Sequence, residues 1–273
     1  METLIVVPAR YGSSRFPGKP LASIAGRSMV ARVAARAKAA ADALGDAHAV
    51  IATDDQRIID HCTEQGIDTV MTPSSLPSGS DRALAAARTR EETPRFVVNL
   101  QGDAPFTPID YVVRVVKRLR VDEVDAATPV VRLGWAALDA IRVNKKTTPF
   151  SGTTAIVGAN GRALWFSKQI LPGIRDEDAR RQKEELSPVR RHVGLYAFRY
   201  ETLEWFVGAE QGIYERIEGL EQLRLLENGK AIACVEVAAP ALSTGGIDTK
   251  EDLARVERLI DEYGDPDDDL FND

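Results

Sequence analysis

Residues 4–21 of the chain read Leu4-Ile5-Val6-Val7-Pro8-Ala9-Arg10-Tyr11-Gly12-Ser13-Ser14-Arg15-Phe16-Pro17-Gly18-Lys19-Pro20-Leu21. The four apolar residues at the start predict a strand that is buried on both faces, as in a parallel sheet. The loop that follows holds small residues, which let backbone N–H groups approach phosphate oxygens, and the three cations Arg10, Arg15 and Lys19. This pattern is typical of a site for a nucleotide triphosphate.

The nearest named motif for such a loop is the P-loop, G-x-x-x-x-G-K-[ST], and the chain does not match it. Five residues separate Gly12 from Gly18, and Pro20 stands where the motif has the hydroxyl that binds magnesium. A solvated basic loop that only closes a strand–helix turn is the alternative interpretation at this point.

Composition excludes several classes of protein. The 273 residues include 44% hydrophobic residues, enough to bury a core, and carry a net charge of −6, with 35 Lys and Arg against 41 Asp and Glu. This acidic balance argues against nonspecific binding to nucleic acid or to an anionic membrane. Cys62 and Cys234 are too few for a disulfide framework. We find no signal peptide and no apolar run of ~18 residues, and we expect a soluble cytoplasmic protein.

Apolar runs and helical periodicity alternate through the first half of the chain. They predict strands at 4–7, 49–53, 69–71, 96–100 and 126–131, and helices at 28–44, 56–65, 80–90 and 108–119. This repeated order predicts an α/β fold with a doubly wound, mostly parallel sheet. Ser28 is the expected N-cap of the first helix. Asp54 and Asp55 either hold a metal ion or, as is more common at a strand end, cap the next helix.

The second half changes character. It predicts a hairpin from strands at 153–157 and 162–166, then a strand at 192–198, a helix at 217–227, a strand at 232–237 and a helix at 250–263 capped by Thr249. Residues 175–185 hold nine charges in eleven positions, so we expect 171–191 to be a solvent-facing excursion, and 175–185 is a candidate lid over a ligand. We expect the acidic tail from 264 onward to be frayed.

Two isolated carboxylates stand out, Asp103 after a predicted strand and Asp248 in a Gly-rich turn before the last helix. Mg²⁺ prefers a few carboxylates together with phosphate oxygens and water, so the pair predicts a magnesium site beside the triphosphate loop. The alternative makes Asp103 a helix-approach cap and Asp248 a turn residue. His48, His61 and His192 lack metal-ligand spacing, and no nucleophile–base triad is visible.

Six ordered motifs support a resemblance that covers nearly the whole chain. The chain resembles the CMP-Kdo synthetase family, cytidylyltransferases that activate the eight-carbon acid sugar Kdo (3-deoxy-manno-octulosonate). The matching segments are Pro8-Ala-Arg-Tyr-Gly-Ser-Ser-Arg-Phe-Pro-Gly-Lys-Pro-Leu21, Ser78-Gly-Ser-Asp-Arg82, Asn99-Leu-Gln-Gly-Asp103, His192-Val-Gly-Leu-Tyr196, Leu220-Glu-Gln-Leu-Arg224 and Gly246-Ile-Asp-Thr249.

The resemblance implies a Rossmann-like nucleotidyltransferase fold with a smaller β-rich excursion, and a homodimer built in part by that excursion. It implies a nucleotide-binding core at 1–135 with 230–264, an acceptor-binding and dimerisation excursion at 136–229, and an acidic tail at 265–273. The implied CTP site consists of Ala9, Arg10, Ser13, Arg15 and Lys19 at the phosphates and Ser78, Gly79, Arg82 and Gln101 around the cytidine. The implied acceptor site consists of Lys168, His192, Tyr196, Glu221 and Gln222, while Asp103 and Asp248 would hold Mg²⁺.

The implied reaction is in-line attack of an acceptor oxygen on the α-phosphorus of CTP, with pyrophosphate leaving. Arg10, Arg15, Lys19, Asp103 and Asp248 are the residues that would stabilise the spreading charge. No protein nucleophile is needed.

The departures from the family pattern gather in the acceptor half. They are Leu76 for a His, Ala104 for a Glu, Thr154 for a Lys, Lys168 for an Arg and Gly173 for an aromatic residue. A lysine gives a point charge where arginine gives a bidentate fork, so Lys168 bears on acceptor identity. Kdo is the first expected acceptor. The alternatives are a small phosphonate such as phosphonoformate, an amino-Kdo, or a nucleotide-binding module without turnover.

Overall fold

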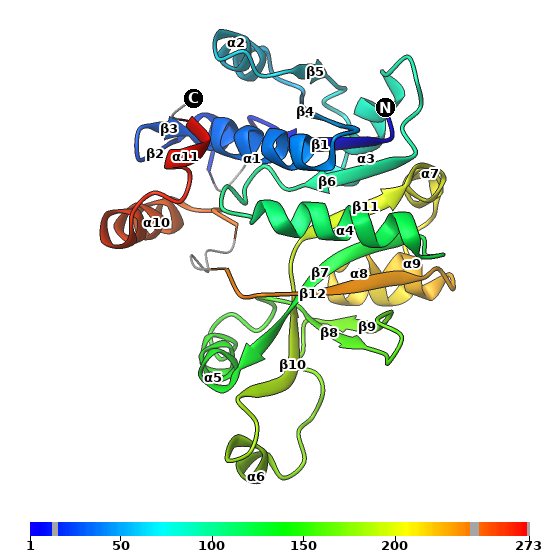
Figure 1. The fold of residues 1–273 in the computed structure, drawn as a ribbon, viewed down its shortest axis with the longest axis vertical. Helices are drawn as coiled ribbons and strands as arrows, with labels where there is room; N and C mark the ends of the chain where they lie inside the picture. Colours follow the sequence, from blue (N-terminus) through cyan, green and yellow to red (C-terminus); the bar gives the residue numbers. More distant parts are fainter. Residues whose placement is uncertain (13–15, 241–245, 272–273) are drawn as a thin grey trace. The chain divides into compact units, whose positions relative to one another are not determined.

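The computed structural model describes residues 1–12, 16–240 and 246–271. The chain divides into two compact units (Figure 1). Unit 1 consists of Met1–Val116, Ala197–Val207 and Pro240–Asp273, and unit 2 of Lys117–Tyr196 and Gly208–Ala239. Within the described ranges, no helix combines the length and the apolar composition needed to cross a bilayer. The expected division by function, 1–135 with 230–264 against 136–229, stays a prediction.

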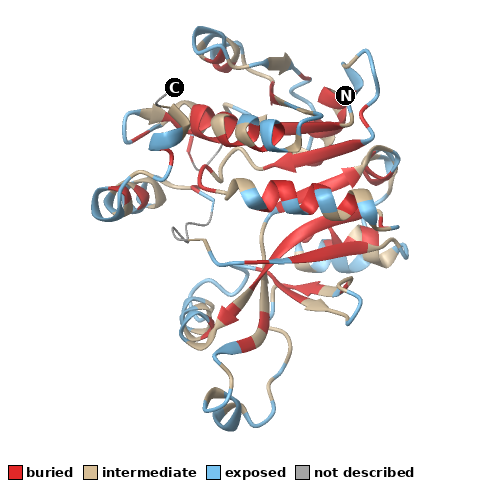
Figure 2. Ribbon diagram, in the orientation of Figure 1, coloured by how far each residue is buried: buried red, intermediate tan, exposed pale blue. Residues whose placement is uncertain are grey.

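Unit 1 is built on parallel strands in the order β5-β4-β1-β6, with β11 next to β6. The strands are β1 (Thr3–Ala9), β4 (Ala47–Thr53), β5 (Thr69–Met71), β6 (Phe96–Leu100) and β11 (Leu195–Arg199), which begins in unit 2. Leu4, Ile5, Val6 and Val7 are fully buried, as the unbroken apolar run predicted. Figure 2 shows the buried residues along β1 and β6.

Helices alternate with these strands, and polar side chains start them. The helices are α1 (Met29–Leu44), α2 (Gln56–Glu64), α3 (Gly79–Arg88), α4 (Ile109–Val121), α7 (Tyr200–Gly208), α10 (Lys250–Tyr263), α11 (Asp268–Phe271) and the 3-10 turn η1 (Lys19–Leu21); a short ribbon of β2 (Ser23–Ile24) and β3 (Arg27–Ser28) precedes α1. Ser28, Asp55, Ser78 and Thr249 each accept a backbone N–H at a helix start. The predicted caps Ser28 and Thr249 are confirmed, and Asp55 caps a helix.

Unit 2 has a mixed sheet in which β7 is central. The order is β12-β7-β10-β8-β9, with β12 parallel to β7 and the other pairs antiparallel. The strands are β7 (Ala126–Gly134), β8 (Thr154–Val157), β9 (Ala163–Ser167), β10 (Leu186–His192) and β12 (Ile232–Val237), and the helices are α5 (Trp135–Asn144), α6 (Glu177–Arg181), α8 (Ile213–Glu218) and α9 (Leu223–Glu227). The predicted hairpin is β8–β9. The predicted α/β class, a mostly parallel sheet flanked by helices with a smaller β-rich part, is confirmed.

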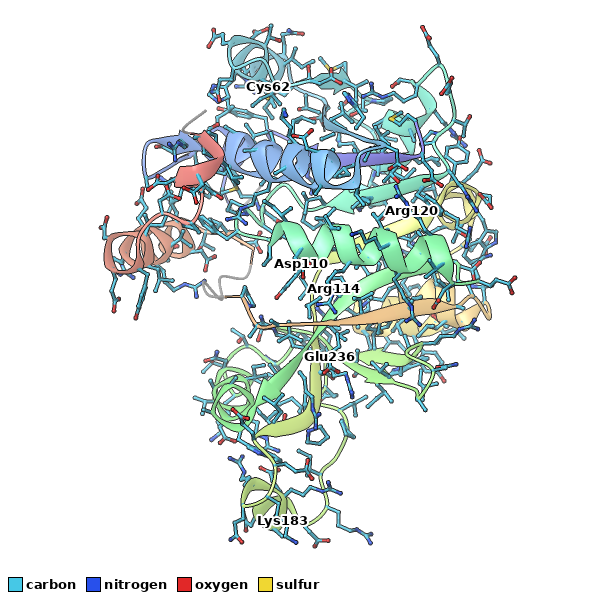
Figure 3. The ribbon with its side chains drawn as sticks, in the orientation of Figure 1. Cys62, Asp110, Arg114, Arg120, Lys183 and Glu236 are labelled. Carbon is cyan, nitrogen blue, oxygen red and sulfur yellow. The ribbon has the colours of Figure 1, made fainter. Side chains whose placement is uncertain are left out.

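The charged segment 171–191 is more ordered than the sequence predicted. Its last residues form β10, which pairs with β7 and β8. Glu177 on α6 binds Arg142 at 2.7 Å and Arg181 at 2.6 Å, and Arg181 also binds Asp139 at 2.6 Å. Figure 3 shows Lys183 beside this helix. The segment is solvent-facing as expected, since residues 171–185 are all exposed or partly exposed, and opposite charges that pair with each other order it. That residues 175–185 form a lid over a ligand stays a prediction.

Two predicted elements had the wrong bounds. The strand predicted at 192–198 is two strands, because β10 ends at His192 and a tight turn, with the N–H of Leu195 donating to Val193 O at 2.7 Å, separates it from β11. The helix predicted at 217–227 is two helices, because Gly219 adopts φ 62° and ends α8. Helices α5 and α7 were not predicted.

The acidic tail is anchored over its described residues, so the expectation of fraying was wrong. Asp267 is fully buried and pairs with Arg32 at 2.8 Å and Arg36 at 2.6 Å, both on α1. Asp265 pairs with Arg32 at 2.6 Å. Arg32, itself fully buried, also donates to Ile24 O at 2.8 Å. We call Arg32, Arg36, Asp265 and Asp267 the tail cluster.

Candidate active site

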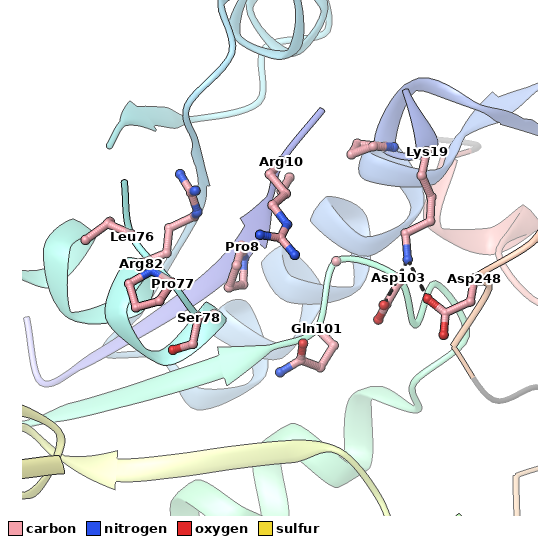
Figure 4. A pocket seen from close by; sticks show the side chains of 14 residues that line it. Pro8, Arg10, Lys19, Leu76, Pro77, Ser78, Arg82, Gln101, Asp103 and Asp248 are labelled. Atoms are coloured by element: carbon pink, nitrogen blue, oxygen red, sulfur yellow. Dashed lines mark hydrogen bonds and ion pairs between the residues drawn. The ribbon is translucent and has the colours of Figure 1, made fainter. Parts of the chain in front are cut away.

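A pocket of about 230 Å³ opens in unit 1 at the carboxyl ends of β1 and β6, where open α/β sheets bind ligands (Figure 4). The loop around Lys19, the start of α3 and the segment before α10 complete its wall. Its lining residues are Pro8, Ala9, Arg10, Lys19, Pro20, Leu76, Pro77, Ser78, Gly79, Arg82, Gln101, Gly102, Asp103 and Asp248. The pocket therefore contains every predicted CTP-site and metal residue except Ser13 and Arg15, which lie outside the described residues.

The loop after β1 is held by its own backbone and by an aromatic ring. Gly18 donates its N–H to Tyr11 O at 3.0 Å and has φ 73°, a left-handed conformation that suits glycine. A Cβ on Gly18 would lie 3.1 Å from the Tyr11 hydroxyl, and the guanidinium of Arg57 stacks 3.4 Å from the centre of the Tyr11 ring. These contacts hold the two ends of the loop that carries Arg10 and Lys19.

Lys19 lies between the two carboxylates that the sequence singled out. Its ammonium nitrogen is 3.0 Å from Asp103 Oδ2 and 3.1 Å from Asp248 Oδ1. Two segments that lie far apart in the chain meet here, because Ile247 donates its N–H to Asp103 O at 2.8 Å. Since one cation bridges both carboxylates, the pair lies close enough to share a positive ion.

The residues that could hold a metal are these two carboxylates. No group of three or more His, Cys, Asp or Glu side chains is arranged as a metal site in the part of the chain that the structure describes. Carboxylate oxygens are hard ligands that suit Mg²⁺, which takes its remaining ligands from water and substrate phosphates. The donor set therefore fits magnesium bound together with a nucleotide.

The far end of the pocket is formed by the start of α3 (Figure 4). Ser78 accepts the N–H of Asp81 at 3.1 Å, and the Ser78 hydroxyl also contacts the Asp81 carboxylate. Arg82 is buried and donates to Thr72 Oγ1 at 2.5 Å and to Asp54 at 3.0 Å. Asp54, weighed above as a metal ligand, instead orients an arginine of the pocket.

The predicted acceptor residues lie in unit 2, and three of them gather. The His192 ring is 5.3 Å from the Tyr196 ring and 5.2 Å from the Phe166 ring. Burial, with the charge of Lys168, lowers the pKa of His192 to about 3. Burial, with the charge of Glu221, raises the pKa of Tyr196 well above its usual value. Lys168, His192 and Tyr196 thus form one cluster in which the imidazole is neutral.

Glu221, whose charge acts on Tyr196, and Gln222 take no part in the ring contacts of that cluster. Glu221 lines a second pocket of about 350 Å³, together with Gln211, Glu215, Arg216 and Gly219. The Gln222 side chain is buried, and its amide nitrogen has no hydrogen-bond partner within the described ranges. A buried donor of this kind is costly unless a ligand or water pairs with it.

The backbone of Lys168 is fixed by charged side chains that sequence reasoning missed. Glu218 accepts the N–H of Lys168 at 2.5 Å, and Lys145 donates to Lys168 O at 2.6 Å. Glu218 also accepts the hydroxyl of Ser167 at 3.0 Å. Glu218 lay in a segment that the sequence predicted as one helix, and no motif singled out Lys145.

Comparisons with known proteins indicate the same class of enzyme as the residues of the pocket do. The model of the cytidylyltransferase family matches residues 4–232. The chain belongs to the cytidylyltransferase family. The predicted resemblance to CMP-Kdo synthetases and the assignment as a CTP-dependent nucleotidyltransferase are confirmed by this match together with the relatives and the solved structure that follow.

Similar curated proteins cover nearly all of the chain. The 3-deoxy-manno-octulosonate cytidylyltransferase of Maricaulis maris is 41% identical over 95% of this chain and 97% of its own length. The protein of the same name from Acinetobacter baumannii is 38% identical over 93% of this chain and 96% of its own length.

A solved structure of CMP:2-keto-3-deoxy-manno-octonic acid synthetase complexed with CTP is similar to this cytidylyltransferase, with TM-score 0.81 and 32% identity over 96% of this chain and 99% of that one. A cytidylyltransferase from Leptospira borgpetersenii, at TM-score 0.59 and 17% identity, shares the fold; it covers 99% of this chain and 92% of its own.

Proposed function

We propose that this cytidylyltransferase transfers CMP from CTP to Kdo and releases pyrophosphate. The observation that carries the proposal is the unit 1 pocket, in which Arg10, Lys19, Asp103 and Asp248 meet at the ends of β1 and β6. The relatives named for Kdo, at up to 41% identity over 95% of the chain, support this acceptor.

The triphosphate is assigned to the Lys19 end of the pocket. Arg10 and Lys19 supply positive charge for phosphate oxygens, together with Ser13 and Arg15 of the same loop. Ala9 lines the same wall. Ser78, Gly79, Arg82 and Gln101 line the opposite end, which we assign to the cytidine. Thr72 and Asp54 fix the guanidinium of Arg82, so Arg82 can recognise the cytidine by hydrogen bonds of defined direction.

Asp103 and Asp248 are the residues that would hold Mg²⁺. Lys19 pairs with both carboxylates, and it can pair with phosphate oxygens when a triphosphate binds. The ion would supply charge neutralisation for the leaving pyrophosphate. The bond that forms joins an acceptor hydroxyl oxygen to the α-phosphorus, and the bond that breaks joins that phosphorus to the bridging oxygen of the leaving pyrophosphate.

The acceptor is assigned to Lys168, His192, Tyr196, Glu221 and Gln222. Lys168 offers a cation for an acid group, and its backbone is anchored by Glu218 and Lys145. The buried amide nitrogen of Gln222 offers a donor that has no partner within the described ranges. These features suit a small acid that also carries hydroxyl groups.

We also propose a homodimer formed through unit 2. The exposed side chains Ile213, Tyr214 and Ile217 on α8 are large and apolar, and Tyr214 packs edge-on against Trp165 of β9 at 5.2 Å. Exposed apolar groups that gather in this way often mark an interface. Light scattering should give twice the chain mass, and Ile217→Glu should give the monomer.

Cys62 and Cys234 are both free and buried. Free thiols are typical of a reducing compartment, which supports the proposal that the protein is located in the cytoplasm.

The test is pyrophosphate release from CTP and magnesium with Kdo, amino-Kdo and phosphonoformate as separate acceptors. Kdo should give the highest kcat/KM. Binding of CTP without release for any acceptor would favour a module without turnover.

The site itself is tested by Asp103→Asn and Asp248→Asn, each of which should lose turnover with the fold retained. Asp110→Asn is the matched control, because this exposed carboxylate pairs only weakly with Arg114 on the surface of α4. Full activity in both site variants would rule out the metal assignment.

A further inference from the structure

A buried threonine on β7 lies beside the imidazole of the acceptor cluster. Thr128 is fully buried, and its Oγ1 is 2.9 Å from Nε2 of His192. The same oxygen is 2.8 Å from Leu195 O and 3.3 Å from Val193 O. None of the functional assignments above uses Thr128.

The distances from Thr128 Oγ1 to its neighbours show where the hydroxyl hydrogen of Thr128 and the ring hydrogen of His192 lie. A threonine hydroxyl has one hydrogen, and a carbonyl oxygen can only accept. Val193 O is the more distant carbonyl and already accepts the N–H of Leu195 at 2.7 Å, and the Tyr196 hydroxyl, which also hydrogen-bonds with Thr128, has a hydrogen of its own to donate, so the Thr128 hydrogen goes to Leu195 O. If it went to His192 instead, two oxygens would face each other at 2.8 Å with no hydrogen between them. Thr128 Oγ1 therefore accepts, and Nε2 of His192 donates.

The ring of His192 is held in this orientation by its neighbours. Phe166 meets it edge-on at 5.2 Å, and Tyr196 lies against it at 5.3 Å. The charged group that acts on the imidazole is Lys168, and together with burial it keeps the pKa of His192 near 3. The ring is thus neutral at physiological pH, and a neutral imidazole with hydrogen on Nε2 carries a lone pair on Nδ1.

We propose that Thr128 is a positioning residue that holds His192 in the Nε2–H tautomer, so that Nδ1 accepts a hydrogen bond from a hydroxyl of the acceptor substrate. Among the residues that the structure describes, none forms a hydrogen bond with Nδ1. The substrate contact rests on the proposed function, whereas the tautomer does not.

The Nε2–H tautomer of His192 affects which acceptor can bind. A lone pair attracts a hydroxyl donor and repels the oxygens of an ionised carboxylate or phosphonate, which only accept. His192 therefore selects for the hydroxyl groups of a sugar acid, while Lys168 serves its acid group. Phosphonoformate has no hydroxyl donor when ionised, so this pair of residues disfavours it.

The tautomer is tested by ¹⁵N NMR of the protein labelled at histidine. The chain has three histidines, so the His192→Asn variant assigns the His192 signals by their loss. The wild type should show a protonated Nε2 and an unprotonated Nδ1 at neutral pH. A protonated Nδ1 in the wild type would overturn the proposal. Because this measurement needs no variant of Thr128, it decides the assignment even where a variant fails to fold.

The positioning role is tested by Thr128→Val, which keeps the shape and removes the oxygen, with Thr128→Ser as the matched variant that keeps the hydroxyl. The valine variant should show a mixture of His192 tautomers and a KM for the acceptor raised about tenfold, the value of one lost hydrogen bond, with the KM for CTP unchanged. The serine variant should restore both. Wild-type tautomer and KM in the valine variant would overturn the role of Thr128, whereas absence of turnover in every protein would count against the proposed function alone.

Discussion

Replacing Asp267 with asparagine should lower the free energy of unfolding of unit 1 by about 3–5 kcal/mol, the cost of removing one partner from a buried ion pair. The Asp267 carboxylate is fully buried and pairs with Arg32 at 2.8 Å and with Arg36 at 2.6 Å. Asparagine keeps one oxygen for these two guanidinium groups, and its NH₂ group must face one of them, donor against donor.

The cost is large because Arg36, unlike Arg32, pairs with no second carboxylate among the described residues. Arg32 is fully buried, and burial is the largest influence on the pKa of Arg36, which it lowers. Asp265 still pairs with Arg32, so the loss falls mainly on Arg36. Since Arg32 also donates to Ile24 O, the tail cluster ties the end of the chain to the strand that follows the Lys19 turn.

The assay is native-state hydrogen exchange of α1, which reports on unit 1 without assuming that both units unfold together. The control is Asp269→Asn, an exposed neighbour on α11 that should change the free energy by less than about 0.5 kcal/mol. Equal protection of α1 in the two variants would refute the energetic role of the tail cluster. The double variant Arg36→Met with Asp267→Leu should recover part of the loss, because Arg32 keeps its pair with Asp265 and the charge of Arg36 is removed together with its partner.

Three further predictions concern single residues. Gly102→Ala should reduce kcat/KM at least about tenfold in steady-state kinetics, because its Cβ would collide with Pro8 O and displace the neighbouring Asp103; unchanged kinetics would contradict this. Two arginines lower the pKa of Glu177 from 4.5 to about 2. The stabilisation that Glu177 gives α6 is therefore complete above pH 4.5 and is lost as the pH falls from 4.5 to 2. Amide hydrogen exchange in α6 should rise over that pH range in the wild type and much less in Glu177→Gln. Burial raises the pKa of Cys62 to about 11 and of Cys234 to about 12, so neither should react with a thiol reagent at pH 8 until the protein is denatured, and rapid reaction of the native protein would show that a thiol is accessible.

Unit 1 was predicted well because its signals are local. Unbroken runs of β-branched and other apolar residues such as Leu4–Val7 are typical of strands buried on both faces, and Ser28 and Thr249 mark helix starts by a hydrogen bond within a few residues. The strand β10 was missed because charged neighbours hide its alternation, and the break at Gly219 was missed because one glycine does not by itself end a helical pattern.

The candidate site also has residues that the sequence predicted and residues that it did not. Residue types predicted a magnesium ion at Asp103 and Asp248, which stays a prediction, but only the fold shows that Lys19 pairs with both carboxylates. Thr128 and Asp267 carried no local signal, because each acts through partners more than 60 residues away in the chain. Pairings over such distances depend on the sheet and on the packing of the tail, which one sequence does not specify.

The most direct test of the central claim is to analyse by mass spectrometry and ³¹P NMR the products formed from CTP, magnesium and Kdo. A cytidylyltransferase for Kdo should give the CMP ester of Kdo and pyrophosphate in equal amounts, with no product from phosphonoformate under the same conditions. Unchanged CTP with Kdo, or a CMP ester formed only with phosphonoformate, would contradict the account.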